Sequence, residues 1–156
     1  MTVHGQQVIR LEFTSAFEML DFVQVVSDHV SRAAGLDEDA MHWVSVAIRE
    51  SVINAIKHGN QSDERKHVFV EFETTEGAAV PELAIRVRDQ GAGFEPETVA
   101  DPLAPENLLK SSGRGIFLIR SFMDDVQLHR APEGGMEIRM IKRAQPPARA
   151  DHPVQA

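Results

Sequence analysis

Alternation between apolar and polar residues constrains the fold of this chain more than any other feature. It occurs in five short segments, at residues 8–13, 67–74, 83–88, 126–129 and 136–143. Successive side chains of a strand point to opposite faces of a sheet, so each segment predicts a strand with one apolar and one polar face. A sheet built from such strands buries one face and exposes the other to water. A doubly wound parallel sheet is disfavoured, because helices would cover both of its faces.

Two longer stretches have helical periodicity and recognisable ends. Ser15 and Glu18 have the spacing of a capping box, which predicts a helix that runs to about residue 34 and stops at Gly35. Asp37 is the expected N-cap of a second helix, which runs to Gly59.

A third, short helix is expected at residues 116–123, and the Pro-Glu-Gly-Gly segment at 132–135 predicts a hairpin between the last two strands. Three helices are enough to cover the apolar face of the sheet. We therefore predict an α/β fold, a two-layer sandwich in which a mostly antiparallel mixed sheet carries three helices on one face. One domain is expected at residues 1–143, followed by a disordered Pro- and Ala-rich tail at residues 144–156.

The charge balance limits the partners of the chain. It has 24 acidic and 16 basic residues and a net charge of -8, which argues against direct binding to nucleic acid or to an anionic membrane. The absence of cysteine excludes disulfides, thiol catalysis and cysteine metal sites. The N-terminus lacks the pattern of a signal sequence, and no apolar run approaches the ~20 residues of a membrane span. We therefore expect a soluble, cytoplasmic protein.

The second predicted helix carries three chemically useful side chains on one stripe. Glu50, Asn54 and His58 are spaced by four residues, so each lies only ~40° around the helix from the one before. Most of the remaining circumference is apolar, which predicts a buried helix. Buried polar groups need partners, which come either from each other and neighbouring strands or from a ligand. The stripe is therefore a candidate floor of a binding pocket.

A second candidate follows the third predicted strand, in the segment Asp89-Gln90-Gly91-Ala92-Gly93-Phe94. Asp89 continues the alternation of Leu83, Ile85 and Val87, and so is expected to face the buried side of the sheet. An inward carboxylate needs a donor, and the two glycines let the backbone come close to a flat or bulky group. The alternative is a glycine turn in which Asp89 accepts hydrogen bonds from its own backbone.

A third candidate is Ser111-Ser112-Gly113-Arg114-Gly115, which directly precedes the helix predicted from Ile116. The N–H groups and the positive end of a helix suit phosphate, and Arg114 and Lys110 add positive charge. The alternative is an ordinary flexible start of a helix, since the segment matches neither a P-loop nor a dinucleotide fingerprint. Residues 95–112 contain three prolines and are expected to form a long loop that acts as a lid.

Taken in this order and spacing, the three candidates resemble the GHKL ATPase superfamily, whose members share the Bergerat or histidine-kinase-like ATPase fold. The resemblance covers residues 8–143. It implies that Asp89 holds the adenine amino group, that Asn54 is the protein ligand of the Mg²⁺ on the ATP phosphates, and that Glu50 is the general base. The nucleotide-binding residues that it implies are Asn54, Lys57, His58, Asp89, Gly91, Gly93, Phe94, Ser112, Gly113, Arg114, Gly115 and Ile116.

Two segments are similar to one branch of the superfamily, the stand-alone anti-sigma-factor serine/threonine kinases of bacterial partner-switching systems. They are Asn-Ala-Ile-Lys-His-Gly-Asn at residues 54–60 and Gly-Arg-Gly-Ile-Phe-Leu-Ile at residues 113–119. At this length we expect neither the second domain of topoisomerase-like or Hsp90-like members nor the phosphoacceptor helix pair of a sensor histidine kinase. The resemblance implies ATP and Mg²⁺ as cofactors and a homodimer. Its implied partners are a sigma factor and, as phosphoacceptor, a STAS-type anti-anti-sigma protein.

One position departs from the pattern of the superfamily. Gly135-Met136 stands where many members have a threonine that reaches the adenine-binding aspartate through water, so one adenine contact lacks its usual partner. Two alternatives to a kinase are a non-catalytic module, which binds nucleotide as a switch or sequesters a partner, and a simple ATPase. Glu50 favours the kinase, because binding alone needs no general base.

Overall fold

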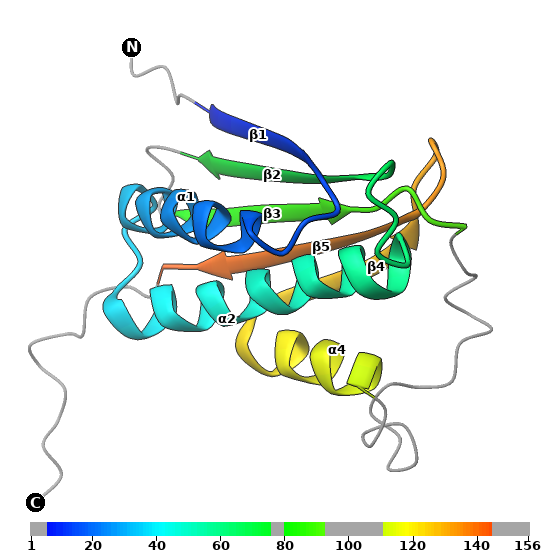
Figure 1. The fold of residues 1–156 in the computed structure, drawn as a ribbon. Coiled ribbons are helices and arrows are strands. Elements are labelled where there is room, and N and C mark those ends of the chain that lie inside the picture. Colours follow the sequence, from blue (N-terminus) through cyan, green and yellow to red (C-terminus); the bar gives the residue numbers. More distant parts are fainter. Residues whose placement is uncertain (1–5, 76–79, 93–110, 145–156) are drawn as a thin grey trace, which may run out of the picture.

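The computed structural model describes residues 6–75, 80–92 and 111–144, with the backbone alone for 111–114, and these residues contain one five-stranded sheet (Figure 1). The strands are β1 (Gln6–Thr14), β2 (His67–Thr75), β3 (Glu82–Arg88), β4 (Asp125–Arg130) and β5 (Met136–Arg143). Their order across the sheet is β1-β2-β3-β5-β4, and every neighbouring pair is antiparallel. The predicted mostly antiparallel sheet is confirmed, and the described strands include no parallel pair that would make it mixed.

Three α-helices of the described residues cover one face of this sheet: α1 (Met19–Ala33), α2 (Glu38–Asn54) and α4 (Ser111–Phe122) (Figure 1). Helix α2 packs against both α1 and α4. Trp43 of α2 stacks on Phe122 of α4, with ring centroids 4.0 Å apart and ring planes 6° apart. No helix in the described part of the chain is both long and apolar enough to span a membrane. The predicted two-layer α/β sandwich is confirmed.

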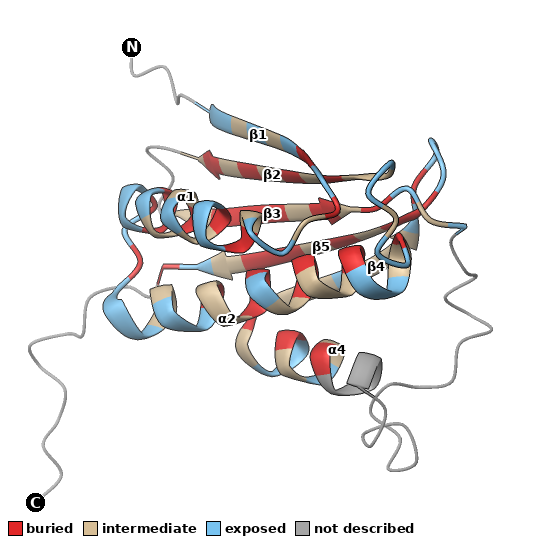
Figure 2. Cartoon of the chain, in the orientation of Figure 1, coloured by how far each residue is buried: buried red, intermediate tan, exposed pale blue. Residues whose placement is uncertain are grey.

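The alternation of the strands decides which of their residues enter the core. In β2, Val68, Val70 and Phe72 are buried under the helices, while the residues between them are partly exposed (Figure 2). The opposite face of the sheet carries charges instead, as in the ion pair of Arg10 and Glu71 at 2.8 Å. One face is therefore dry and the other wet, as the sequence pattern predicts.

The start of α1 differs from the sequence prediction. Its N-cap is Glu18, which makes no capping hydrogen bond, and the Ser15 hydroxyl donates instead to the Lys66 carbonyl at 2.8 Å. The predicted capping box is wrong because Ser15 lies just after β1, beside the residue that precedes β2, and its side chain bonds across to that backbone. Two other predicted ends are confirmed: α1 stops before Gly35, which has a φ of +78°, and the Asp37 side chain caps α2.

The C-terminal end of the second helix also differs from the prediction. The α-helix does not continue to Gly59 but widens after Asn54 into one π-helical turn, η1 (Ala55–Gly59). The Asn60 N–H donates to the Ala55 carbonyl at 2.8 Å, an i→i+5 bond. Such turns are rare and occur frequently at functional sites, and no residue-level propensity predicts them.

The start of α4 lies earlier than predicted. The helix begins at Ser111 rather than at Ile116, so Gly113-Arg114-Gly115 forms part of its N-terminal region instead of preceding it. Glycine disfavours helix by local propensity, but most helical stability in proteins comes from tertiary packing, here of α4 on α2.

Candidate functional site

A cavity of about 350 Å³ lies where α2, η1 and α4 meet the strands β3, β4 and β5. The described residues that line it are Ser51, Asn54, Ala55, His58, Gly59, Gln61, Val87, Asp89, Ala92, Ile116, Leu128, Met136 and Ile138. Its volume falls in the range of roughly 300–1,000 Å³ that is usual for small-molecule sites, and its lining is mostly apolar with a few polar groups. Residues from the first two predicted stretches therefore meet at one cavity with Ile116, which directly follows the third stretch.

Asp89 is the buried carboxylate of this cavity, with 5% of its surface exposed. It lies just after β3 and follows the buried Leu83, Ile85 and Val87, so the predicted parity is confirmed. Its Oδ1 accepts hydrogen bonds from the N–H groups of Gly91 at 2.9 Å and Met136 at 3.1 Å. The bond from Gly91 is the local turn that the sequence left open as the alternative, and here it coexists with a position on the cavity wall. Burial raises the pKa of the Asp89 carboxyl, and the two N–H groups partly oppose that rise.

Glycines allow the backbone to close tightly around Asp89. A Cβ added to Gly59 would overlap the Asp89 carboxylate, and one added to Gly135 would overlap the Asp89 carbonyl. A Cβ added to Gly91 would overlap the carbonyl oxygen of Gly59. The sequence analysis missed the roles of Gly59 and Gly135. The glycine doublet before β5 was the one visible signal, and its contact with Asp89 depends on the fold.

Backbone groups at the start of β5 contact Asp89 from both sides. The Asp89 N–H donates to the Met136 carbonyl at 3.0 Å, and the Met136 N–H donates to the Asp89 side chain. Met136 stands where the resemblance expects a threonine, and Met136 itself lines the cavity. The backbone of this residue therefore supports the aspartate without a threonine side chain.

Glu50 and Asn54 lie together against α4. A Cβ added to Gly115 would come within 2.8 Å of Asn54 Nδ2 and 3.2 Å of Glu50 Oε2, so both side chains approach the backbone at the N-terminal end of α4. The free N–H groups and the positive end of a helix lie in that region. Both side chains are half-buried and His58 is exposed, so the predicted stripe borders a solvent-accessible site rather than lying in a closed core.

The cavity contains some of the predicted site residues and leaves others outside its described lining. Asn54, His58, Asp89 and Ile116 line it, whereas Lys57 is exposed and does not belong to that lining. Outside the described residues lie Gly93, Phe94, the predicted lid before residue 111 and the predicted tail after residue 144. The structure describes Ser112, Gly113 and Arg114 by their backbone alone.

Comparisons with known proteins agree with the fold. The family model described as the histidine kinase-like ATPase domain matches residues 13–142. The chain is 26% identical over 147 residues to the serine-protein kinase RsbW of Listeria innocua, covering 90% of this chain and 88% of the relative. It is 29% identical over 144 residues to the serine-protein kinase RsbW of Staphylococcus epidermidis, covering 88% and 87%. The matched segment contains both the Asp89 pocket and the Glu50–Asn54 pair, and the chain belongs to the histidine kinase-like ATPase domain family.

Proposed function

We propose that this protein is an ATP-dependent serine/threonine protein kinase and an anti-sigma factor of a bacterial partner-switching system. It binds a sigma factor, and it phosphorylates a STAS-type anti-anti-sigma protein. We further propose that it works as a cytoplasmic homodimer. One observation carries the kinase proposal: a single cavity joins the buried Asp89 carboxylate to Asn54, and Glu50 lies beside Asn54 under the start of α4. The relatives named as serine-protein kinases support it over most of the chain.

The adenine of ATP is proposed to bind beside Asp89. A carboxylate accepts a hydrogen bond from the adenine amino group, and the Gly91 and Met136 amides bind the other carboxylate oxygen, Oδ1. Val87, Leu128 and Ile138 supply apolar walls of the kind that cover the faces of a flat ring.

The triphosphate and Mg²⁺ are proposed to lie near Asn54 and the start of α4. Among the described residues no group of three His, Cys, Asp or Glu side chains is placed to hold a metal ion by itself. A site with few protein oxygen ligands suits Mg²⁺, because this ion usually takes one or two protein ligands together with substrate phosphates and water. The Asn54 amide oxygen would supply one ligand, and the N–H groups of α4 would bind phosphate oxygens. The ion would neutralise phosphate charge.

Glu50 is proposed to act on the hydroxyl of the protein substrate. The hydroxyl oxygen forms a bond to the γ-phosphorus while the bond from that phosphorus to the β–γ bridging oxygen breaks, leaving ADP. The proton of the hydroxyl passes to the Glu50 carboxylate.

The proposal is tested by Glu50→Gln, which keeps the shape of the side chain and removes the base. We expect phosphate transfer to a purified STAS-domain protein to fall by roughly 10²–10⁴-fold with little change in ATP affinity. Glu64→Gln is the matched control. Glu64 is exposed and lies outside the described lining of the cavity, so this substitution removes the same charge away from the site. Undiminished transfer by Glu50→Gln would remove Glu50 from the mechanism. ATP binding by the wild type without transfer to a STAS-domain protein would replace the kinase with a nucleotide-binding switch.

A further inference from the structure

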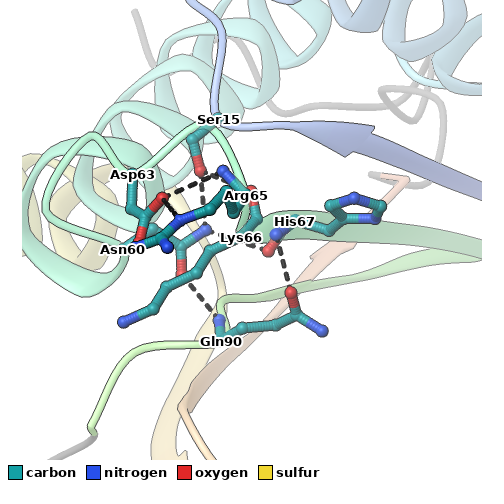
Figure 3. A network of polar contacts seen from close by, with 7 residues as sticks. All are labelled: Ser15, Asn60, Asp63, Arg65, Lys66, His67 and Gln90. Carbon is teal, nitrogen blue, oxygen red and sulfur yellow. Dashed lines mark hydrogen bonds and ion pairs between the residues drawn. The ribbon is translucent and has the colours of Figure 1, made fainter.

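Asn60 is a fully buried amide directly after η1, with none of its surface exposed. Its Nδ2 donates to the Ser15 hydroxyl at 2.9 Å and to the His67 carbonyl at 2.9 Å, and its Oδ1 accepts from the Gln90 N–H at 2.7 Å (Figure 3). Each bond goes to a different segment of the chain: the end of β1, the start of β2, and the turn after β3. One side chain therefore ties three segments to the end of the α2–η1 helix.

The orientation of this amide is fixed by its partners. A backbone N–H only donates and a backbone carbonyl only accepts, so Oδ1 must face Gln90 and Nδ2 must face His67. A buried amide whose two N–H groups and carbonyl oxygen are all bonded resists displacement, because breaking any bond leaves an unpaired buried group.

Asn60 lies next to the tight contact that shapes the cavity. Gly59 packs against the Asp89 carboxylate, and the next residue of each segment, Asn60 and Gln90, forms the hydrogen bond. The pair of contacts joins the helix that carries Asn54 to the turn that carries Asp89.

We infer that Asn60 is a positioning residue, which holds the Asp89 carboxylate against the helix at the place where it meets the adenine amino group. The inference rests on the proposed nucleotide function and adds a residue that sets purine specificity. Asn60 does not itself line the cavity in the described residues, so it acts through Asp89.

A second hydrogen bond to the same turn, made by the Gln90 side chain, supplies a control. The Gln90 side-chain Oε1 accepts from the His67 N–H at 2.7 Å on the exposed side (Figure 3). Gln90→Ala removes this hydrogen bond but keeps the Gln90 backbone N–H that donates to Asn60. If the buried hydrogen bonds of Asn60 set the position of Asp89, this variant keeps the wild-type preference for ATP over ITP.

The test compares Mg·ATP with Mg·ITP, which has a 6-oxo group in place of the amino group and is otherwise the same at ribose and triphosphate. We expect the wild type to prefer ATP by roughly tenfold or more, the worth of a charge-assisted hydrogen bond. In Asn60→Ala the ratio of the two dissociation constants should fall several-fold towards one, with the ITP affinity nearly unchanged. Calorimetric titration is made at a temperature where circular dichroism shows each variant folded.

The possible outcomes distinguish failure of the positioning role of Asn60 from failure of the proposed function. A folded Asn60→Ala that keeps the wild-type ratio, or that loses ATP and ITP affinity equally as a purely structural defect does, overturns the positioning role and leaves the nucleotide function standing. A wild type that binds both nucleotides equally overturns the positioning role together with the proposed adenine contact of Asp89. If Asn60→Ala does not fold, amide hydrogen exchange on the wild type decides: the Gln90 N–H should be protected like the amides of β3, and exchange as fast as in an exposed loop overturns the positioning role.

Discussion

Asp89 is subject to two opposing requirements. The ionised carboxylate is the stronger acceptor for an amino group, yet burial against Gly59 disfavours the charge and raises the pKa of the carboxyl. The Gly91 and Met136 N–H groups oppose that effect without cancelling it. In the nucleotide-free protein, the ionised Asp89 therefore lowers the stability of the folded state, as is common for binding residues.

Asp89→Asn tests this with stability measured against pH. The folded-state pKa lies above the ordinary value of 3.8, so ionised Asp89 lowers the stability of the empty protein at neutral pH. That loss is recovered as the pH falls through the folded-state pKa towards 3.8. Asparagine keeps an oxygen for the two N–H donors and removes the charge. We expect Asp89→Asn to melt at a higher temperature than the wild type at pH 7, with the difference shrinking towards pH 4. A difference that grows on acidification would contradict the assignment.

Helix α4 depends for its position on a missing side chain. Gly115 lets the start of the helix approach Asn54 and Glu50, the two side chains proposed to handle Mg²⁺ and the proton. The atoms nearest to an added Cβ are the ends of flexible side chains, so a larger residue would displace these groups rather than unfold the helix.

Gly115→Ala should therefore separate stability from activity. Alanine favours helix over glycine by up to ~1 kcal/mol, so we expect the free energy of unfolding to stay level or rise. Phosphate transfer should fall at least tenfold, since shifts of roughly 1 Å in reacting groups are that costly. Both are measured on one preparation, by denaturant unfolding and by phosphate transfer to a STAS-domain protein.

Gly35→Ala is the opposite control. Gly35 has a φ of +78° and no heavy atom within 4 Å of an added Cβ, so alanine there is strained but not crowded. We expect a loss of ~1–2 kcal/mol in stability with unchanged phosphate transfer. Full activity in Gly115→Ala would show that the close approach of α4 is not needed.

The elements that the sequence predicts correctly are those with local causes. The period of two along β3 places Asp89 on the buried face, and Asp37 caps α2 through its own turn. The capping box predicted at Ser15 is wrong, because the Ser15 hydroxyl donates to a carbonyl on a neighbouring segment instead of capping the turn that follows it.

The parts of the site that the sequence does not predict depend on contacts between distant segments. Gly59 and Gly135 meet Asp89 only in the folded sheet, and Asn60 has its partners on three separate segments. Apart from the glycine doublet before β5, composition and spacing contain no signal for such contacts. The motif residues could be recognised, but not the residues that hold them in place.

At the scale of the whole molecule, charge sets the conditions for binding ATP. The chain carries a net charge of -8, and the described lining of the cavity contains the Asp89 carboxylate but no lysine or arginine. An anionic triphosphate approaches such a site against repulsion unless its charge is neutralised. The helix end of α4 supplies only about half a positive charge. We therefore expect nucleotide binding to depend strongly on Mg²⁺.

Calorimetric titration of ATP into the wild type and Asp89→Asn, each with and without Mg²⁺, tests the nucleotide site most directly. The account predicts that the wild type binds ATP tightly only with Mg²⁺, and that Asp89→Asn weakens this binding by roughly tenfold or more. Equal binding by both proteins would contradict the role of Asp89. No binding by the folded wild type in the presence of Mg²⁺ would contradict the nucleotide site altogether.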